Sequence, residues 1–126
     1  MSILTYRNNV SNEQLLLLLL ERAMRDEAAA IQAIAENDRP RWIGEIVHAR
    51  SIYLELLSAL DHSVAPEVTQ NLRRTYTWAL HQLSEACRTG ESVTVQRVLE
   101  ATASLYEGWM EAIASPRIGE SMAASP

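Results

Sequence analysis

Apolar residues recur at helical spacing in four windows of similar length, and a helix-stop signal separates each window from the next. The windows run from about 12 to 36, 40 to 60, 66 to 88 and 92 to 114. The short connections between them force neighbouring helices to run antiparallel. No window alternates as a strand would. The pattern predicts an all-α, antiparallel up-down four-helix bundle over residues 11–115, with a flexible N-terminal segment (1–10) and a flexible C-terminal tail (116–126).

Helix start and stop signals stand at these boundaries. Ser11 and Gln14 have the spacing of a capping box, in which each side chain satisfies a backbone N–H. Asp38 can cap the second helix, and Pro40 ends the first helix by restricting the residue before it. The remaining signals are a first-turn proline, a glycine suited to a left-handed end and a serine that can cap the fourth helix: Pro66, Gly90 and Ser92.

Charge and cysteine content narrow the class of protein. The formal net charge of -5 argues against a nucleic-acid partner, because phosphate binding needs basic clusters. Cys87 is the single cysteine, so no internal disulfide can form and a reducing compartment is expected. The leucine run at 15–20 is shorter than the roughly 20 apolar residues that span a bilayer, and no basic leader precedes it. We therefore expect a cytoplasmic protein with no membrane partner.

The sequence holds no recognisable catalytic or cofactor motif. A di-iron bundle needs two Glu-x-x-His motifs, and Glu45 and His48 supply that spacing once, with His48 on the polar side of its helix. Neither His62 nor His81 has a glutamate three residues before it. Cys87 falls in an apolar stripe, where a thiol is usually inert. We expect no enzyme activity, no cofactor and no metal.

The helices differ in how much apolar surface they carry. The third and fourth each show one core stripe. Their members are Val68, Leu72, Tyr76, Ala79, Leu80, Leu83 and Cys87, and Val95, Val98, Leu99, Leu105, Tyr106, Trp109 and Ile113. In the second helix, apolar residues between Ile43 and Leu60 cover roughly 220°, about twice the stripe that core packing requires. Leu15, Leu18 and Trp78 also fall outside their stripes. This excess either flanks the core or forms an exposed groove that binds a partner.

Glu27 and Arg50 interrupt otherwise apolar stripes at matching distances from the turn near Asp38. In an antiparallel hairpin they should face each other, and buried charges are tolerated when paired. We therefore predict an ion pair between them.

Several segments together resemble the flagellin export chaperone family, FliS, over about residues 6–114. The first is Ser11-Asn12-Glu13-Gln14-Leu15 followed by Leu18, which resembles the start of the family's first long helix. The others are Ala49, Ile52, Leu56 and Leu60-Asp61 in the second helix, Tyr76, Trp78, Leu83, Glu85 and Ala86 in the third, and Leu105, Trp109, Glu111 and Ala112 in the last.

The resemblance implies a cytoplasmic chaperone that binds the disordered C-terminal segment of flagellin, prevents premature polymerisation and delivers the subunit for export. An amphipathic segment that folds as it enters an apolar groove fits this role. The resemblance also suggests that Tyr6 covers part of the site. The candidate partner-binding residues are Tyr6, Leu15, Leu18, Val47, Ala49, Ile52, Leu56 and Trp78. A self-associating bundle, in which the same surface forms a homodimer, is the alternative.

Overall fold

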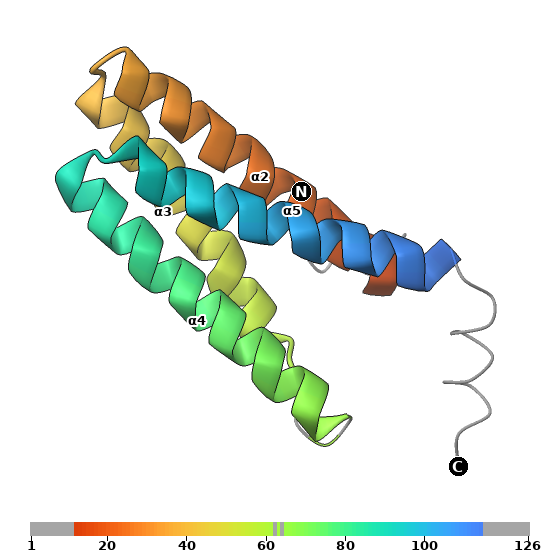
Figure 1. The fold of residues 1–126 in the computed structure, drawn as a ribbon. Coiled ribbons are helices and arrows are strands. Elements are labelled where there is room, and N and C mark those ends of the chain that lie inside the picture. Colours follow the sequence, from red (N-terminus) through yellow and green to blue (C-terminus); the bar gives the residue numbers. More distant parts are fainter. Residues whose placement is uncertain (1–11, 62, 64, 115–126) are drawn as a thin grey trace.

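A computed structural model describes residues 12–61, 63 and 65–114, and these form four helices (Figure 1). The helices are α2 (Asn12–Ala35), α3 (Arg39–Ser58), α4 (Pro66–Thr89) and α5 (Ser92–Ala114). The described part of the chain contains no strand. The predicted all-α four-helix bundle is confirmed. Both predicted flexible ends, together with Tyr6 and Ser11, lie outside the described residues.

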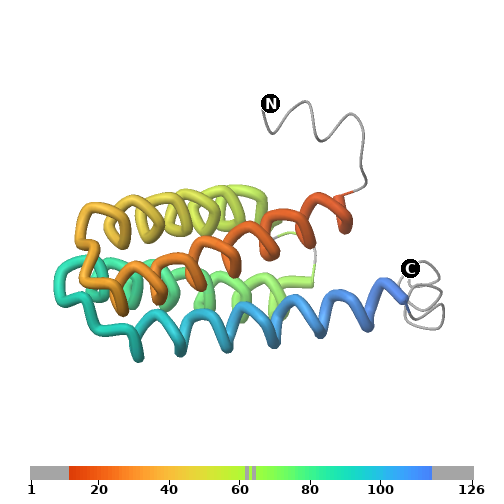
Figure 2. Tube along the Cα trace, turned by 90° about the horizontal axis from the view of Figure 1, so that it is seen from above, coloured from red at the N-terminus to blue at the C-terminus, as the bar shows by residue number. Residues whose placement is uncertain are grey.

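The four helices form a ring in which each helix contacts its two neighbours. α2 packs against α3 and α5, and α4 packs against the same two helices. The backbones of the two diagonal pairs lie farther apart, and Tyr53 of α3 reaches Thr102 of α5 across the core. Figure 2 shows the antiparallel course of the chain. The α4–α5 pair has the least extensive contact, and α4 diverges from α5 towards the end of the bundle where α5 finishes (Figure 1).

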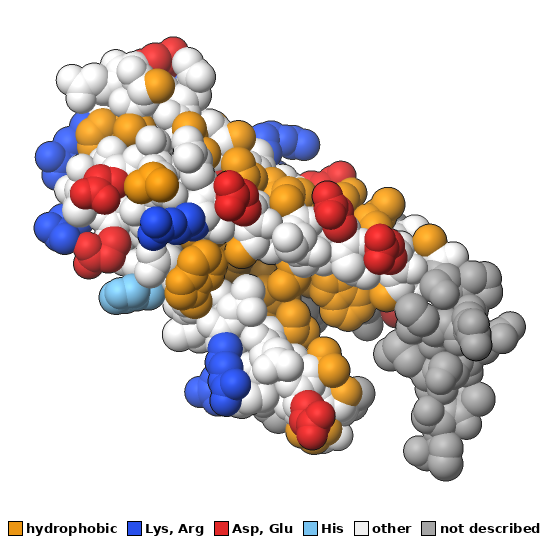
Figure 3. Space-filling model, in the orientation of Figure 1, with side chains coloured by type: hydrophobic (Ala, Val, Ile, Leu, Met, Phe, Trp, Pro, Cys, Tyr) orange, Lys and Arg blue, Asp and Glu red, His pale blue; other side chains and the backbone are white. Residues whose placement is uncertain are grey.

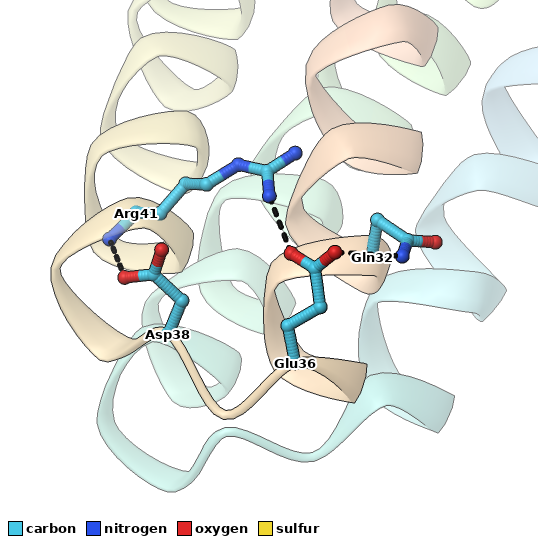
Figure 4. Close-up of polar contacts among 4 residues, drawn as sticks. All are labelled: Gln32, Glu36, Asp38 and Arg41. Atoms are coloured by element: carbon cyan, nitrogen blue, oxygen red, sulfur yellow. Dashed lines mark hydrogen bonds and ion pairs between the residues drawn. The ribbon is translucent and has the colours of Figure 1, made fainter.

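The turn between α2 and α3 is fixed by local polar contacts (Figure 4). Asn37 adopts a left-handed conformation with φ 57°, which Asn tolerates better than most residues. Asp38 accepts a hydrogen bond from the backbone N–H of Arg41 at 3.3 Å, which confirms it as the cap of α3. Glu36 accepts from the Arg41 guanidinium at 2.6 Å and from Gln32 at 3.1 Å. These contacts hold the turn that sets the register of α2 against α3.

α4 ends at Gly90, which has φ 71°, as the sequence predicts for a left-handed helix end. The indole of Trp42, at the start of α3, lies against this turn and donates its Nε1–H to the carbonyl of Cys87 at 3.3 Å. α5 begins at Ser92 itself, so Ser92 is the first helical residue and not the flanking cap.

The core runs along the centre of the ring and is built mostly from apolar side chains. Its members are Leu20, Ala23, Ala30, Ala33, Trp42, Ile46, Ala49, Ile52, Tyr53, Leu56, Tyr76, Ala79, Leu83, Ala86, Val95 and Val98. Two residues assigned to core stripes from the sequence are instead exposed, Val68 by 55% and Ile113 by 44%. Both lie where α4 and α5 diverge, so neither has a facing helix to cover it.

The predicted ion pair between Glu27 and Arg50 is wrong: no such pair forms within the described residues. The Oε2 atom of Glu27 lies 2.5 Å from the hydroxyl of Tyr53, and Arg50 Nε is buried without a hydrogen-bond partner. Glu27 lies in α2 and Arg50 in α3, so both belong to the hairpin as expected. A buried phenol reaches the carboxyl group from within the core, and the guanidinium does not.

Candidate functional site

A groove between α2 and α3, with a volume of about 400 Å³, opens on the described surface. It is referred to below as the α2–α3 groove. The residues that line it are Leu15, Leu18, Leu19, Glu21, Arg22 and Arg25 from α2, and His48, Ser51, Ile52 and Glu55 from α3. From 15 to 25 the groove follows α2 for about ten residues, or about 15 Å at 1.5 Å per residue. This length matches nearly three turns of a bound helix.

The floor of the α2–α3 groove is apolar. Leu15 and Ile52 are almost fully buried beneath it, and Leu19 is half-buried. Leu18 stands at its edge with 42% of its surface exposed. Three of the sequence-predicted partner-binding residues (Leu15, Leu18 and Ile52) therefore come together here.

Polar side chains form the rim of the groove. Asp26 Oδ2 and His48 Nδ1 lie 2.5 Å apart and link α2 to α3 beside the groove, with Asp26 buried and His48 exposed. Glu21 accepts a hydrogen bond from the Tyr106 hydroxyl of α5 at 2.9 Å, and this bond raises the pKa of Tyr106. Arg22 and Arg25 are exposed and form no ion pair with other described residues. Two cationic groups at the rim are therefore available for an anionic partner.

Four other predicted partner-binding residues do not line the α2–α3 groove: Val47, Ala49, Leu56 and Trp78. Tyr6 lies outside the described residues. Ala49 and Leu56 are buried in the core and present almost no surface. Val47 is exposed, but it precedes Ile52 by five residues and so lies roughly 140° around α3 at about 100° per residue. Leu54, also exposed, shares the flank of Val47.

Trp78 lies in a second place, between α4 and α5. It lines a small cavity of about 10 Å³ together with Thr75, Ala101 and Leu105, and Tyr53 and Thr102 lie at the same cavity. Figure 3 shows apolar side chains gathered in the hollow between the two helices. The single groove expected from the sequence is thus divided into two separate apolar sites on different sides of the bundle.

Leu19, Arg22 and Arg25 were not among the partner-binding residues predicted from the sequence. Arg22 and Arg25 are three residues apart and therefore adjacent on one face of α2. Their spacing from Leu15 and Leu18 could have placed them beside the same surface. Which face of α3 meets them depends on the hairpin register, which the sequence leaves open.

The described residues do not meet the requirements of a metal site, a disulfide or a membrane span. No group of three His, Cys, Asp or Glu side chains within them could hold a metal ion. Cys87 is half-buried, packs against the core and is not in a disulfide. None of α2 to α5 combines the length and the apolar content that a membrane crossing requires.

The fold places the chain among the all-α four-helix-bundle proteins. Comparison with known sequences gives the family. The model of the family described as flagellar protein FliS matches residues 5–116, and the chain belongs to that family. It is also 29% identical over 101 residues to the flagellar secretion chaperone FliS of Campylobacter jejuni subsp. jejuni serotype O:6 (strain 81116 / NCTC 11828). That match covers 80% of this chain and 79% of the relative. The family is one of chaperones in flagellar secretion, which is not a class of enzymes.

Proposed function

We propose that this chain is a cytoplasmic export chaperone for flagellin and that it holds the C-terminal segment of flagellin in the α2–α3 groove. Its family membership supports the role in flagellar secretion. The groove carries the proposal for the binding mode, because Leu18 and Leu19 are open to solvent there above the buried Leu15 and Ile52.

An amphipathic helix suits this groove. Apolar side chains at helical spacing in the client would contact Leu18, Leu19 and Ile52, as in other complexes where a helix lies in a groove. A segment that is disordered before binding loses conformational entropy as it folds, and this cost keeps the complex reversible. Reversible binding lets the chaperone release its client for export.

The rim suggests which clients bind best. Arg22 and Arg25 lie along the α2 edge of the groove without acidic partners among the described residues. A carboxylate on the flank of the bound helix would pair with one of them. We expect such pairs to speed association more than they strengthen binding, and to weaken as salt is added.

The experiment uses two matched leucines. Leu18→Glu places a charge at the edge of the groove, and Leu54→Glu places the same charge on an exposed leucine of α3 outside it. Binding of the C-terminal flagellin segment to the full chain is measured by titration calorimetry. We expect Leu18→Glu to raise Kd about tenfold or more, equivalent to at least about 1.4 kcal/mol, and Leu54→Glu to leave it unchanged.

Three outcomes contradict the proposal. No binding by the unaltered chain rejects the flagellin client, and equal effects of the two substitutions reject the placement of the client in this groove. A dimer that Leu18→Glu converts to a monomer, with no flagellin binding, would identify the groove as a self-association surface.

A further inference from the structure

Three oxygen-bearing side chains meet in the core and join three helices. Glu27 of α2 is fully buried, and Tyr53 of α3 and Thr102 of α5 are almost so. Tyr53 Oη lies 2.5 Å from Glu27 Oε2 and 2.5 Å from Thr102 Oγ1. Thr102 Oγ1 lies 2.7 Å from the carbonyl oxygen of Val98 in its own helix.

The contacts that lead from Glu27 to Val98 require more protons than the two hydroxyl groups carry. Each oxygen–oxygen hydrogen bond uses one proton, so the three contacts from Glu27 to Val98 need three. The hydroxyls of Tyr53 and Thr102 supply two, and the carbonyl supplies none. A proton on Glu27 completes the series: Glu27 donates to Tyr53, Tyr53 donates to Thr102, and Thr102 donates to Val98.

The surroundings of Glu27 favour the same protonation state. Burial raises the pKa of Glu27 from 4.5 to about 8 and outweighs the hydrogen bonds from Tyr53 and Thr102, which lower it. The Oε1 atom is buried without a hydrogen-bond partner, which is far more costly for a carboxylate than for a neutral acid.

The charged and titratable groups of the neighbouring helices do not neutralise Glu27. Asp26, next to it on α2, opposes its ionisation and is itself bonded to His48 of α3. Arg50 of α3 makes no ion pair with it. From α4, the ring of Tyr76 lies 6.2 Å from that of Tyr53, and burial raises the pKa of Tyr76 to about 12. On α5, the contact is Thr102, which does not titrate.

We propose that Glu27 carries a proton in the folded protein at neutral pH, and that this proton fastens α5 to α2 and α3. When Glu27 is ionised, Tyr53 donates to the carboxylate, and Thr102 has one proton for two contacts. The bond from α3 to α5 or the bond from Thr102 to Val98 is then lost. Tyr53 and Thr102 also line the small cavity that Trp78 lines between α4 and α5. This proposal does not depend on the identity of the client.

Carbon-13 NMR of the side-chain carboxyls in the full chain tests the protonation state directly. Glu27→Gln removes one carboxyl signal and so assigns it. We expect the Glu27 signal of the unaltered protein to titrate with a midpoint near pH 8. A midpoint at or above pH 7 supports the proposal, and a midpoint below pH 7 overturns it.

Backbone hydrogen exchange tests whether the proton on Glu27 holds α5 against α2 and α3. The amides of 98–106 in α5 are followed from pH 6 to 9, with rates corrected for the intrinsic effect of pH. We expect their protection to fall at least tenfold across the titration of Glu27 in the unaltered chain and to stay constant in Glu27→Gln. Equal profiles in the two proteins would overturn the claim that the proton holds α5 in place.

Discussion

Glycine-to-alanine substitution should change stability in opposite directions at two positions of this bundle. Gly90 has φ 71°, where a residue with a Cβ costs about 1–2 kcal/mol. A Cβ at Gly90 would also stand 2.8 Å from Trp42 Cζ2 and 3.1 Å from Cη2. The indole is held by its hydrogen bond to Cys87 and by burial, so it has little freedom to move away. Overpacking of this kind costs a further 1–3 kcal/mol or so.

Gly108 gives the matched control. It lies inside α5, and a Cβ there would meet nothing within 4 Å. Alanine is favoured over glycine in a helix interior by about 0.8–1 kcal/mol. We therefore expect Gly90→Ala to lower the free energy of unfolding by about 2–5 kcal/mol and Gly108→Ala to raise it by about 1 kcal/mol.

Urea unfolding followed by circular dichroism measures both changes. Gly90→Asn separates the two costs, because asparagine tolerates the left-handed conformation but still places a Cβ against the indole. It should remain well below the unaltered protein in stability. A Gly90→Ala protein within 1 kcal/mol of the unaltered chain would refute the assignment of Gly90 and Trp42 as a tight contact.

Two further substitutions test the polar contacts. The pKa of Glu27 is higher in the folded than in the unfolded chain, so the folded state binds more protons between about pH 4.5 and 8. The free energy of unfolding therefore falls as pH rises through that window. The free energy of unfolding of the unaltered protein minus that of Glu27→Gln should fall by about 1.4 kcal/mol per pH unit there and level off above pH 8. A flat difference from pH 5 to 8 in urea unfolding would contradict this. Asp38→Ala removes the cap of α3 and should lower the free energy of unfolding by about 1 kcal/mol, seen as a lower Tm in a thermal melt. An unchanged Tm would show that the bond from Arg41 N to Asp38 adds no stability.

The sequence was sufficient to predict the helices, because periodicity and end signals are local. Asp38, Pro66 and Gly90 each act through the backbone of their own turn, so their effects needed no knowledge of neighbouring helices. Ser92 was misplaced by one position for a related reason: several residues of a short turn can serve as the boundary.

Contacts between helices were predicted less well. The wide apolar arc of α3 arises partly because α3 lies between α2 and α4 and buries residues towards both. Ala49 and Leu56 are buried by this packing, while Val47 and Leu54 remain exposed on the side of α3 away from the core. Periodicity gives the width of an apolar face but not which part of it a neighbour covers.

The divergence of α4 from α5 is a further property of the assembled bundle. It exposes Val68 and Ile113 and sets Trp78 apart from the α2–α3 groove. The hydrogen bonds of Glu27 also depend on three helices meeting at one level, so pairing it with Arg50 by sequence spacing alone gave the wrong partner.

Methyl cross-saturation NMR tests the proposed chaperone role most directly. The chain is labelled at its Leu, Ile and Val methyls, and magnetisation is transferred from an unlabelled C-terminal flagellin segment bound to it. We predict transfer to Leu18, Leu19 and Ile52 around the α2–α3 groove, and none to Val47 or Leu54. Transfer confined to the α4–α5 side, at Val68 and Ile113, would contradict the proposed binding site.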